Sequence, residues 1–320
     1  MRSLSQKSAS KPKLKPKVPR PALTVGELLG RVTRRFRRAQ LFYGHGTLDA
    51  GDDAAALLVH ALGSEPPLTA AQLRRRAAVA VIAEVERLAE RRLRERVPVV
   101  YLTQRCWYAG LPLYIDSRVL IPRSPIAELI EQHFEPWIVP QRVRRILDVG
   151  TGSGCIALAC ARAFPKARVD AVDIDPSALE VARLNIRRLR LARRVRALQS
   201  DHFAALKADR YDIIVSNPPY VGRREMAGLP AEYRHEPRGA LAAGPDGMDS
   251  VRVLLREAIS HLQPGGILVV EVGNTERAVR RAFPHLPFLW LQFSRGGGGV
   301  FLLTREQLQA SAGSKRQSRS

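Results

Sequence analysis

The feature that most constrains the fold is a buried strand that runs directly into a glycine-rich loop and an apolar helix. All three parts lie in Ile146-Leu-Asp-Val-Gly-Thr-Gly-Ser-Gly-Cys-Ile-Ala-Leu-Ala. Gly150, Gly152 and Gly154 let the backbone turn tightly and approach a ligand closely. Their G-x-G-x-G spacing differs from the G-x-G-x-x-G spacing that dinucleotide-binding folds prefer. We therefore expect an α/β domain in which this loop binds a small ligand.

Strand-like and helical segments alternate from residue 124 onward, which predicts a mostly parallel, doubly wound sheet of seven strands. Only the glycine-rich residues 295–299 separate the last two strands, so this pair must be antiparallel. A parallel sheet that ends in such a hairpin is the Rossmann-like variant of class I methyltransferases. The expected strands cover residues 145–149, 168–172, 195–199, 211–216, 266–272, 288–293 and 300–303.

The segments before this α/β region predict a second, smaller domain. Thr24 and Glu27 form a capping-box pattern, and the residues that follow have helical periodicity. A long helix is expected over residues 69–96, because Pro98 would end it. The expected boundaries are a disordered basic tail at 1–20, a helical substrate-recognition domain at 21–105, a β-hairpin linker at 106–123, the methyltransferase domain at 124–305 and a disordered tail at 306–320.

The net charge of +22 is not confined to the ends of the chain. Residues 1–20 carry seven Lys or Arg and residues 311–320 carry three, with no acid in either segment, so +12 remains on residues 21–310. A basic body attracts polyanions, and nucleic acid is the commonest polyanion in the cytoplasm. An Arg-rich genome composition explains the charge of the body equally well at this stage.

Cysteine usage and hydropathy indicate a reducing, cytoplasmic setting. Cys106, Cys155 and Cys160 are odd in number and lack metal-ligand or redox spacing, so we expect no metal site. The longest apolar stretches are far too short to cross a bilayer, and no apolar run follows the basic N-terminus. We therefore expect a cytoplasmic protein with no membrane partner.

Two acids and a histidine stand near strand ends, where open α/β sheets bind ligands. Asp148, beside the glycine loop, would repel a phosphate and suits a cationic ligand. Asp173 follows Gly154 by 19 residues, about the separation at which an acid reaches ribose hydroxyls, so it is the candidate ligand of an adenosyl diol. His202 is either an adenine contact or a satisfied structural histidine. The expected cofactor site combines these three residues with Gly150, Thr151, Gly152 and Gly154.

The tetrapeptide Asn217-Pro218-Pro219-Tyr220 follows a hydrophobic strand and specifies the chemistry. Pro219 restrains Pro218 to an extended conformation, so the Pro218 carbonyl stays free to accept a hydrogen bond. With the Asn217 side-chain carbonyl it offers two acceptors to one NH2 group, over which Tyr220 can pack. We expect methyl transfer from S-adenosylmethionine to a planar nitrogen. Asn217, Pro218 and Tyr220 are its candidate catalytic residues, the whole tetrapeptide binds the substrate, and Asn217 also contacts the cofactor.

The chain resembles the bacterial protein-(glutamine-N5) methyltransferases over residues 24–303, and within them the branch that acts on a ribosomal protein. The resemblance implies that the glycine loop and Asp173 bind S-adenosylmethionine. It also implies that residues 217–220 hold a glutamine amide of large-subunit ribosomal protein L-three. The tetrapeptide is common to this family and to DNA adenine methyltransferases. More specific are Tyr43-Gly-His-Gly-Thr47, Val119-Leu-Ile-Pro-Arg-Ser-Pro-Ile126, Tyr233-Arg-His-Glu-Pro237 and Gly244-Pro-Asp-Gly247.

Three other functions stay open on the residues alone. They are glutamine methylation of release factors, amino-group methylation of a nucleic-acid base, and a non-enzymatic role in ribosome assembly. Release-factor enzymes usually have Arg-Pro-Asp or Arg-Pro-Glu where this chain has Arg123-Ser124-Pro125. Because ribosomal protein L-three is itself basic, we also expect a large-subunit assembly intermediate, in which ribosomal RNA bridges enzyme and substrate.

Three surrounding segments each have two interpretations. The loop that contains His45 either faces the substrate or is a turn between helices. Arg123 and Glu128 either hold the loop above the cofactor or form an exposed ion pair of little energetic value. Glu236 and Pro237 either begin a mobile lid or belong to a solvated connection.

Overall fold

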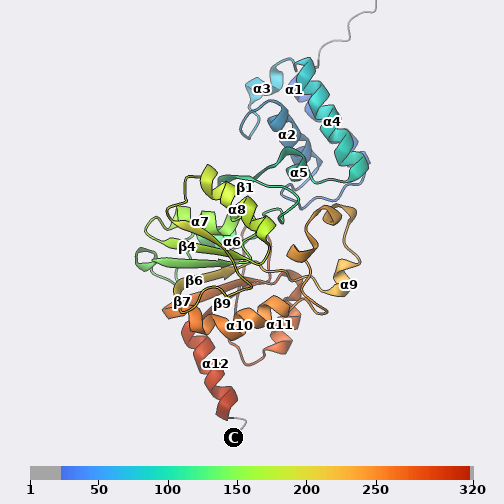
Figure 1. Ribbon diagram of the computed structural model, residues 1–320. Helices are drawn as coiled ribbons and strands as arrows, with labels where there is room; N and C mark the ends of the chain where they lie inside the picture. The colour runs from blue at the N-terminus through green and yellow to red at the C-terminus, as the bar shows by residue number, and fades with distance from the viewer. Residues whose placement is uncertain (1–22, 318–320) are drawn as a thin grey trace, which may run out of the picture.

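The computed structural model describes residues 23–317, so the tail expected at residues 1–20 lies outside the described residues. Figure 1 shows a small helical domain, drawn in blue, above a larger α/β domain that contains the sheet. The helices of the small domain are α1 (Val25–Arg38), α2 (Ala50–Ala61), α3 (Ala70–Arg74), α4 (Val79–Glu95) and α5 (Val99–Thr103).

An apolar core holds the helical domain together. The Thr24 hydroxyl accepts the Glu27 N–H and the Glu27 carboxylate accepts the Thr24 N–H, so the predicted capping box begins α1. Leu28, Val32 and Phe36 lie on one face of α1 and are buried in a cluster shared with α2 and α4. Tertiary packing of this face, more than helix propensity, stabilises helices of this length.

The single helix expected over residues 69–96 is wrong, because the chain is extended between α3 and α4. The Arg75 carbonyl accepts the Val25 N–H, and the Ala77 N–H donates to the Leu23 carbonyl. These bonds to the segment before α1 satisfy the backbone groups that a continuous helix would have paired. Long-range pairing therefore overrides a strong local helix propensity.

A two-stranded hairpin connects the domains, as expected, but it ends at residue 114 and not at residue 123. β1 (Arg105–Tyr108) pairs with β2 (Leu111–Tyr114). Only Ala109 and Gly110 separate them, both with positive φ (47° and 72°), which suits the tight turn of a two-residue hairpin loop. The chain reaches residues 119–122 only after the hairpin is complete.

The predicted seven-stranded α/β sheet is confirmed. Its strand order is β5-β4-β3-β6-β7-β9-β8, with the first five strands parallel and β9 antiparallel to both of its neighbours. The chain crosses from one half of the sheet to the other between β5 and β6, so the carboxyl ends of β3 and β6 flank a topological switch point. The strands are β3 (Arg145–Val149), β4 (Arg168–Asp173), β5 (Val195–Gln199), β6 (Tyr211–Ser216), β7 (Leu262–Glu271), β8 (Leu289–Leu291) and β9 (Val300–Thr304).

Helices cover both faces of the sheet, as a doubly wound fold requires (Figure 1). One face packs against α6 (Ile126–Glu131), α7 (Cys155–Ala163) and α8 (Pro176–Arg188). The other face packs against α10 (Asp249–His261), α11 (Glu276–Ala282) and α12 (Arg305–Gln317). No helix within residues 23–317 has the length and apolar character needed to span a membrane.

The C-terminal segment differs from the disordered tail expected at residues 306–320. Helix α12 (Arg305–Gln317) continues directly from β9. Leu308 is buried against the core below the sheet, and the Gln307 N–H donates to the Thr304 hydroxyl in a capping arrangement. A single apolar anchor and a cap therefore extend the ordered domain beyond its predicted boundary.

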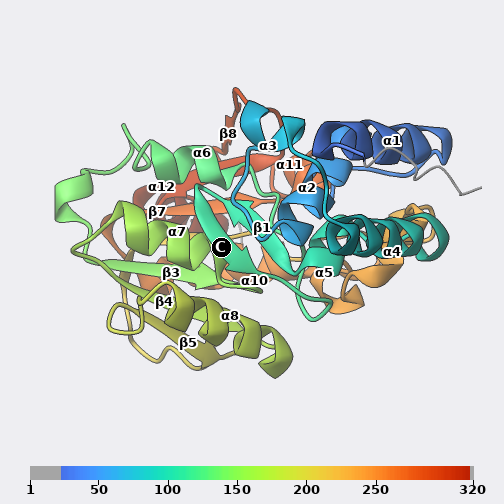
Figure 2. The ribbon, with the colours of Figure 1, turned by 90° about the horizontal axis from the view of Figure 1, so that it is seen from above.

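A long connection follows β6 and returns to the helical domain. It contains α9 (Arg223–Met226) and the 3-10 turns η2 (Ala231–His235) and η3 (Arg238–Ala240). Figures 1 and 2 both show this orange segment beside the end of α4. We call residues 231–240 the strap, because it lies between the helical domain and the catalytic cavity described below.

Candidate active site

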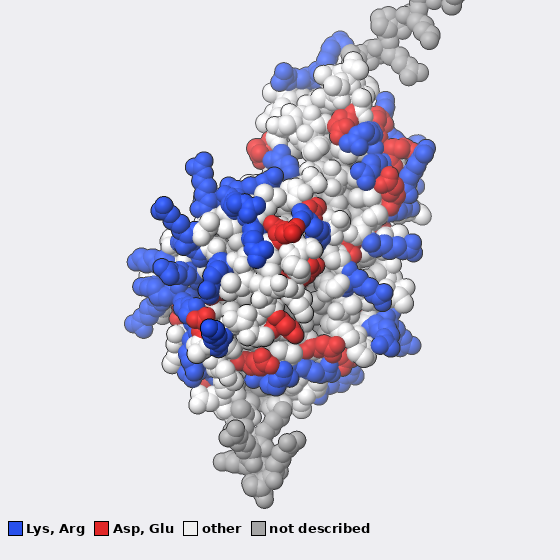
Figure 3. Space-filling view, in the orientation of Figure 1, with Lys and Arg blue, Asp and Glu red and all other residues white. Residues whose placement is uncertain are grey.

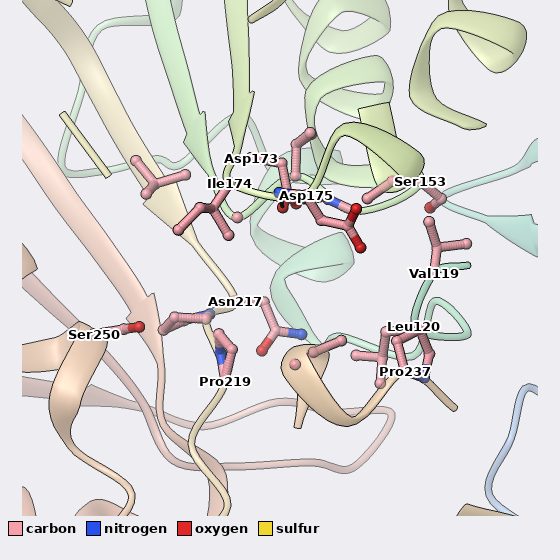
Figure 4. A pocket seen from close by; sticks show the side chains of 18 of the residues that line it. Val119, Leu120, Ser153, Asp173, Ile174, Asp175, Asn217, Pro219, Pro237 and Ser250 are labelled. Atoms are coloured by element: carbon pink, nitrogen blue, oxygen red, sulfur yellow. Dashed lines mark hydrogen bonds between the residues drawn. The ribbon is translucent and has the colours of Figure 1, made fainter. Parts of the chain in front are cut away.

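A cavity of about 350 Å³ lies at the carboxyl ends of β3, β4 and β6. This is the position at which open α/β sheets bind ligands, and the volume falls within the range of small-molecule pockets. Figure 4 shows Asp173 and Asp175 on one side of the cavity and Asn217 with Pro219 on the other. Its lining includes the sequence-predicted Gly150, Thr151, Gly152, Asp173, His202, Asn217, Pro218 and Pro219, and also Val119, Leu120, Pro122, Pro237, Gly239, Ala240, Ala242 and Ser250.

The glycine loop has the left-handed conformations that its sequence requires. Gly150 and Gly152 have φ of 72° and 54°, a region that residues with a Cβ adopt at a cost. The Gly152 N–H donates to an Asp173 carboxylate oxygen at 2.8 Å and so joins the loop to the end of β4. Gly154 does not line the cavity, but its φ of 82° at the start of α7 also favours glycine.

Asp173 is held in place by backbone donors. Its second carboxylate oxygen accepts the Asp175 N–H at 3.0 Å, and burial raises the pKa of the Asp173 carboxyl. Each oxygen keeps a further lone pair, so the carboxylate can accept two hydrogen bonds from a vicinal diol. Asp175 also caps α8 through the Ser177 N–H, as its place before Pro176 predicts.

Asp148 lies beneath the cavity and does not line it. The side chain is 1% exposed, and one carboxylate oxygen accepts the Thr151 hydroxyl at 2.6 Å and the Ala157 N–H at 3.0 Å. Its other oxygen has no partner among the described residues. The structure therefore gives Asp148 a role in shaping the loop and the start of α7.

We expect the stability contributed by Asp148 to fall as pH rises. Burial raises the pKa of Asp148 to about 7, against about 3.9 in an unfolded chain. The folded state therefore favours the protonated acid, and this contribution is fully present below pH 4 and lost between pH 4 and 7. Urea unfolding should show the advantage of wild type over Asp148→Asn declining by about 4 kcal/mol across that window. A pH-independent difference would contradict a raised pKa.

His202 lines the cavity with a positive φ of 47°, which is unusual for a residue with a Cβ. Its Nδ1 lies 2.6 Å from a carboxylate oxygen of Asp201. The Ser200 hydroxyl donates to the His202 carbonyl, and this hydroxyl accepts the Ala205 N–H. The loop after β5 is thus fixed by its own hydrogen bonds, with the imidazole beside the cavity.

The tetrapeptide brings two acceptors to the cavity. The Asn217 side chain extends into it (Figure 4), and Pro218 and Pro219 line it. Neither the Asn217 side chain nor the Pro218 carbonyl accepts a hydrogen bond from another described residue. The Ser216 hydroxyl donates to the Val149 carbonyl at 2.7 Å, so the ends of β3 and β6 are tied together next to the glycine loop. Sequence reasoning missed this serine.

Tyr220 does not line the cavity. Its hydroxyl donates to Glu271 at 3.1 Å, and Glu271 also accepts the Ser124 hydroxyl at 2.5 Å. Burial raises the pKa of Glu271, and a Cβ at Gly273 would lie only 2.6 Å from the Tyr220 ring. The ring is therefore held from behind by groups that the sequence did not single out, and its predicted packing over the substrate stays a prediction.

The strap connects the cavity wall to two arginines, the half-buried Arg123 and the buried Arg92. Arg123 forms a bidentate ion pair with Glu236 at 2.5 and 2.8 Å, and the Ile121 N–H donates to the same carboxylate. Pro237, which follows, lines the cavity. The expected pairing of Arg123 with Glu128 does not occur, because Glu128 instead accepts hydrogen bonds from Ser294 and Arg295.

Arg92 of α4 holds the other end of the strap. It is 2% exposed and donates to Asp53 at 2.8 Å, to Glu232 at 3.2 Å and to the Phe42 carbonyl at 2.7 Å. Carboxylates of two different elements thus meet one guanidinium at the domain junction. The strap is therefore pinned to the helical domain as well as to the cavity wall.

His45 lies at the same junction. It is buried, has no hydrogen-bond partner among the described residues, and lies 3.8 Å from Glu236. Its ring contacts Tyr233 at a centroid distance of 4.5 Å. Burial lowers the pKa of His45 to about 4, so the ring is neutral at pH 7. The Tyr43-to-Thr47 loop therefore packs against the strap.

No cluster of three or more His, Cys, Asp or Glu side chains suited to a metal ion occurs in residues 23–317. The cavity instead suits an organic cation. Asp173 and Asp175 line it, Asp148 lies below it, and the glycine loop leaves room for a ligand at its rim. The residues present therefore fit an adenosyl group that carries a positive charge.

Comparison with known proteins identifies the family. Residues 128–230 match the family model of the methyltransferase small domain. The ribosomal protein uL3 glutamine methyltransferase of Neisseria meningitidis serogroup B is 44% identical over 286 residues, which cover 89% of this chain and 94% of that protein. The chain belongs to this family. The Neisseria gonorrhoeae member is 43% identical over 89% of this chain and 95% of its own length.

Among solved structures, a Pyrococcus furiosus methyltransferase matches with a TM-score of 0.44 and 23% identity, over 61% of this chain and 89% of that one. The near-full-length similarity to the uL3 glutamine methyltransferases includes the helical domain and the strap as well as the catalytic domain. The predicted family resemblance is confirmed, whereas the individual roles predicted for the site residues stay predictions.

Proposed function

We propose that this chain transfers a methyl group from S-adenosylmethionine to the side-chain amide nitrogen, N5, of a glutamine in ribosomal protein uL3 (L-three). The observation that carries the proposal is the pair of unpartnered acceptors at Asn217 and Pro218. They lie in the same cavity as Asp173, which is placed to accept hydrogen bonds from an adenosyl diol. Membership of the uL3 methyltransferase family supports the choice of a glutamine amide over a base amine.

The donor supplies a methyl group on a cationic sulfonium, which is already activated for transfer. The protein therefore needs no strong base, and its contribution is to position a weak nucleophile. Asn217 and the Pro218 carbonyl accept the two hydrogens of the glutamine NH2 and orient its nitrogen toward the methyl group. They also stabilise the positive charge that develops on that nitrogen. The N–C bond forms as the S–C bond of the donor breaks, and the methylated nitrogen then loses one proton to water, because an N-protonated amide is a strong acid.

Neighbouring groups keep this clamp rigid. The hydrogen bond from Ser216 to the Val149 carbonyl fixes the strand end, and the bond from Tyr220 to Glu271 fixes the last residue of the tetrapeptide. Pro219 and Pro237 supply apolar surface around Asn217, which limits access of water. The electrostatic interactions within the cavity are strengthened by this desolvation.

Asp173→Ala is expected to weaken S-adenosylmethionine binding at least tenfold, because the variant loses both acceptors of the ribose diol and the hydrogen bond to the Gly152 N–H. Isothermal titration measures the change in Kd. Asp201→Ala is the matched control, since Asp201 also lines the cavity but is mostly exposed, and within the described residues its carboxylate contacts only His202. Equal affinities of Asp173→Ala and wild type would remove Asp173 from the cofactor site.

The proposal also specifies the form in which the substrate protein is methylated. The substrate is a large-subunit assembly intermediate in the cytoplasm, in which ribosomal RNA links the basic enzyme to the basic uL3. Equal methylation rates for free uL3 and for ribosomal precursors, with no effect of added RNA, would contradict this setting.

The class of acceptor is tested by incubating the enzyme with tritium-labelled donor and separated protein and RNA fractions of large ribosomal subunits. We expect label in uL3 and none in RNA. Label in RNA would instead support base methylation, and label in purified release factors at a greater rate than in uL3 would support the release-factor alternative.

A further inference from the structure

Four adjacent parallel strands begin at or next to an exposed arginine or lysine. Arg144 precedes β3, Arg168 begins β4, Arg193 precedes β5 and Arg210 precedes β6. Because parallel strands start at the same edge of a sheet, these residues lie along one edge, opposite the edge that carries the cavity. Figure 3 shows Lys and Arg gathered on this flank of the catalytic domain, away from α9.

Within the described residues, the carboxylates of this edge are already engaged by other groups. Asp170 and Asp209 pair with Arg145 and Arg196. Asp212 accepts the backbone N–H groups of Arg144 and Arg145. We define the amino-end face as six exposed residues whose side chains form no ion pair with a carboxylate among the described residues: Arg144, Lys166, Arg168, Arg193, Lys207 and Arg210.

Helix capping does not account for this charge. Arg187 and Arg188 lie in the last turn of α8, where a cation interacts favourably with the helix macrodipole, so they are left out of the face. The six residues of the amino-end face instead lie in loops or on the first residue of a strand. Their like charges repel one another, a cost that a bound anion would reduce.

We propose that the amino-end face binds the phosphate backbone of RNA that accompanies the protein substrate. The proposal rests on the proposed function, in which that substrate is a ribosomal protein. Four of the six residues are arginines, whose planar guanidinium matches phosphate in a bidentate geometry. Among the exposed large apolar side chains, only Val139 lies in a segment that leads to this face, so the surface lacks the apolar anchors of a membrane-binding site.

The position of the amino-end face would allow the basic enzyme and the basic uL3 to bind the same RNA molecule. Strands of five or six residues, at about 3.3 Å per residue, separate it from the cavity by roughly 20 Å. RNA bound at this edge therefore leaves the cavity open to a glutamine of the substrate. RNA and protein substrate are predicted to bind together and not in competition.

The test compares two full-length variants that lose the same number of positive charges. The first, face variant replaces four residues of the amino-end face: Lys166→Gln, Arg168→Gln, Arg193→Gln and Lys207→Gln. The second, control variant removes four arginines that are already paired with carboxylates: Arg87→Gln, Arg91→Gln, Arg94→Gln and Arg280→Gln. Fluorescence anisotropy with a labelled RNA hairpin measures affinity. We expect the first variant to bind at least about tenfold more weakly, with a salt slope reduced by about 3, and the second to change less than threefold.

Equal losses in the two variants, or wild-type binding in the first, would overturn the proposal. So would binding of wild type to phosphatidylglycerol vesicles but not to the hairpin. These assays contain no methyl donor, so they can fail while the proposed function stands. The first variant should methylate free uL3 at the wild-type rate, and a parallel loss of that rate would show that the edge serves the catalytic fold instead.

Discussion

Asn217→Ala is expected to reduce kcat by at least about 100-fold while changing the Kd for S-adenosylmethionine less than threefold. The substitution removes one of only two acceptors for the amide NH2 group, and loss of one pre-positioned hydrogen-bonding group in a transition state costs about 10²–10³ in rate. The Pro218 carbonyl remains, but a single acceptor leaves the nitrogen free to rotate. Single-turnover methylation of uL3, with donor affinity measured separately, checks both halves of the expectation.

Asn274→Ala is the matched control for this variant. Asn274 is exposed and donates to Glu225, outside the cavity lining, so its loss should leave kcat within twofold of wild type. Wild-type turnover in Asn217→Ala would rule out the clamp. A large loss of donor affinity without a change in kcat would place Asn217 in the cofactor site alone.

Arg92→Met is expected to destabilise the protein by about 3–5 kcal/mol, the cost of leaving buried carboxylates without their partner. Asp53 and Glu232 both lose their guanidinium, and the Phe42 carbonyl loses its donor. Urea unfolding followed by circular dichroism measures the free-energy change. Because the strap includes Glu232 and continues into the cavity wall at Pro237, the variant should also raise the KM for the donor.

The neighbouring Arg91→Met variant provides the control. Arg91 is exposed and pairs with Glu95 on the surface of the same helix, so its loss should change stability by less than about 0.5 kcal/mol. Adding Asp53→Asn and Glu232→Gln to Arg92→Met should recover part of the lost stability, since no buried charge is then left unpaired. A loss of under 1 kcal/mol in Arg92→Met would contradict a structural role for the buried ion cluster.

The parts of the site that the sequence predicts lie at the ends of neighbouring parallel strands. Gly150, Asp173 and Asn217 each follow a recognisable strand, and parallel pairing of β4, β3 and β6 brings the three strand ends together. Local sequence is therefore enough to predict these site residues, because the parallel pairing of the strands places their carboxyl ends side by side. The sheet itself was predictable from its alternation with helices and from the short turn before β9.

The groups that hold the site in place join residues that are distant in sequence. Arg123 and Glu236 are 113 residues apart, Arg92 and Glu232 are 140 apart, and no local pattern encodes either pair. One signal was present: Arg92 follows Leu88 by four residues, on the buried face of α4. A charged side chain on an apolar helix face predicts a buried ion pair, but the sequence does not identify the carboxylate that forms it.

The hairpin and the interrupted helix show the limits of local propensity. Residues 119–122 have strand-like composition but no strand to pair with, while the turn at Ala109-Gly110 sets the true register. Similarly, residues 69–96 favour helix throughout, yet their middle is extended because it bonds to the segment before α1. In the hairpin and in the interrupted helix, backbone pairing with another segment decides the secondary structure.

Tandem mass spectrometry of a reaction that contains enzyme, S-adenosylmethionine and large-subunit precursors tests the central claim most directly. The account predicts one uL3 peptide heavier by a single CH2 group, with fragment ions that place the methyl on the side chain of a glutamine. The same peptide should be unmodified with Asn217→Ala. A methyl group on RNA, on another ribosomal protein, or on a residue of uL3 other than glutamine would contradict the account.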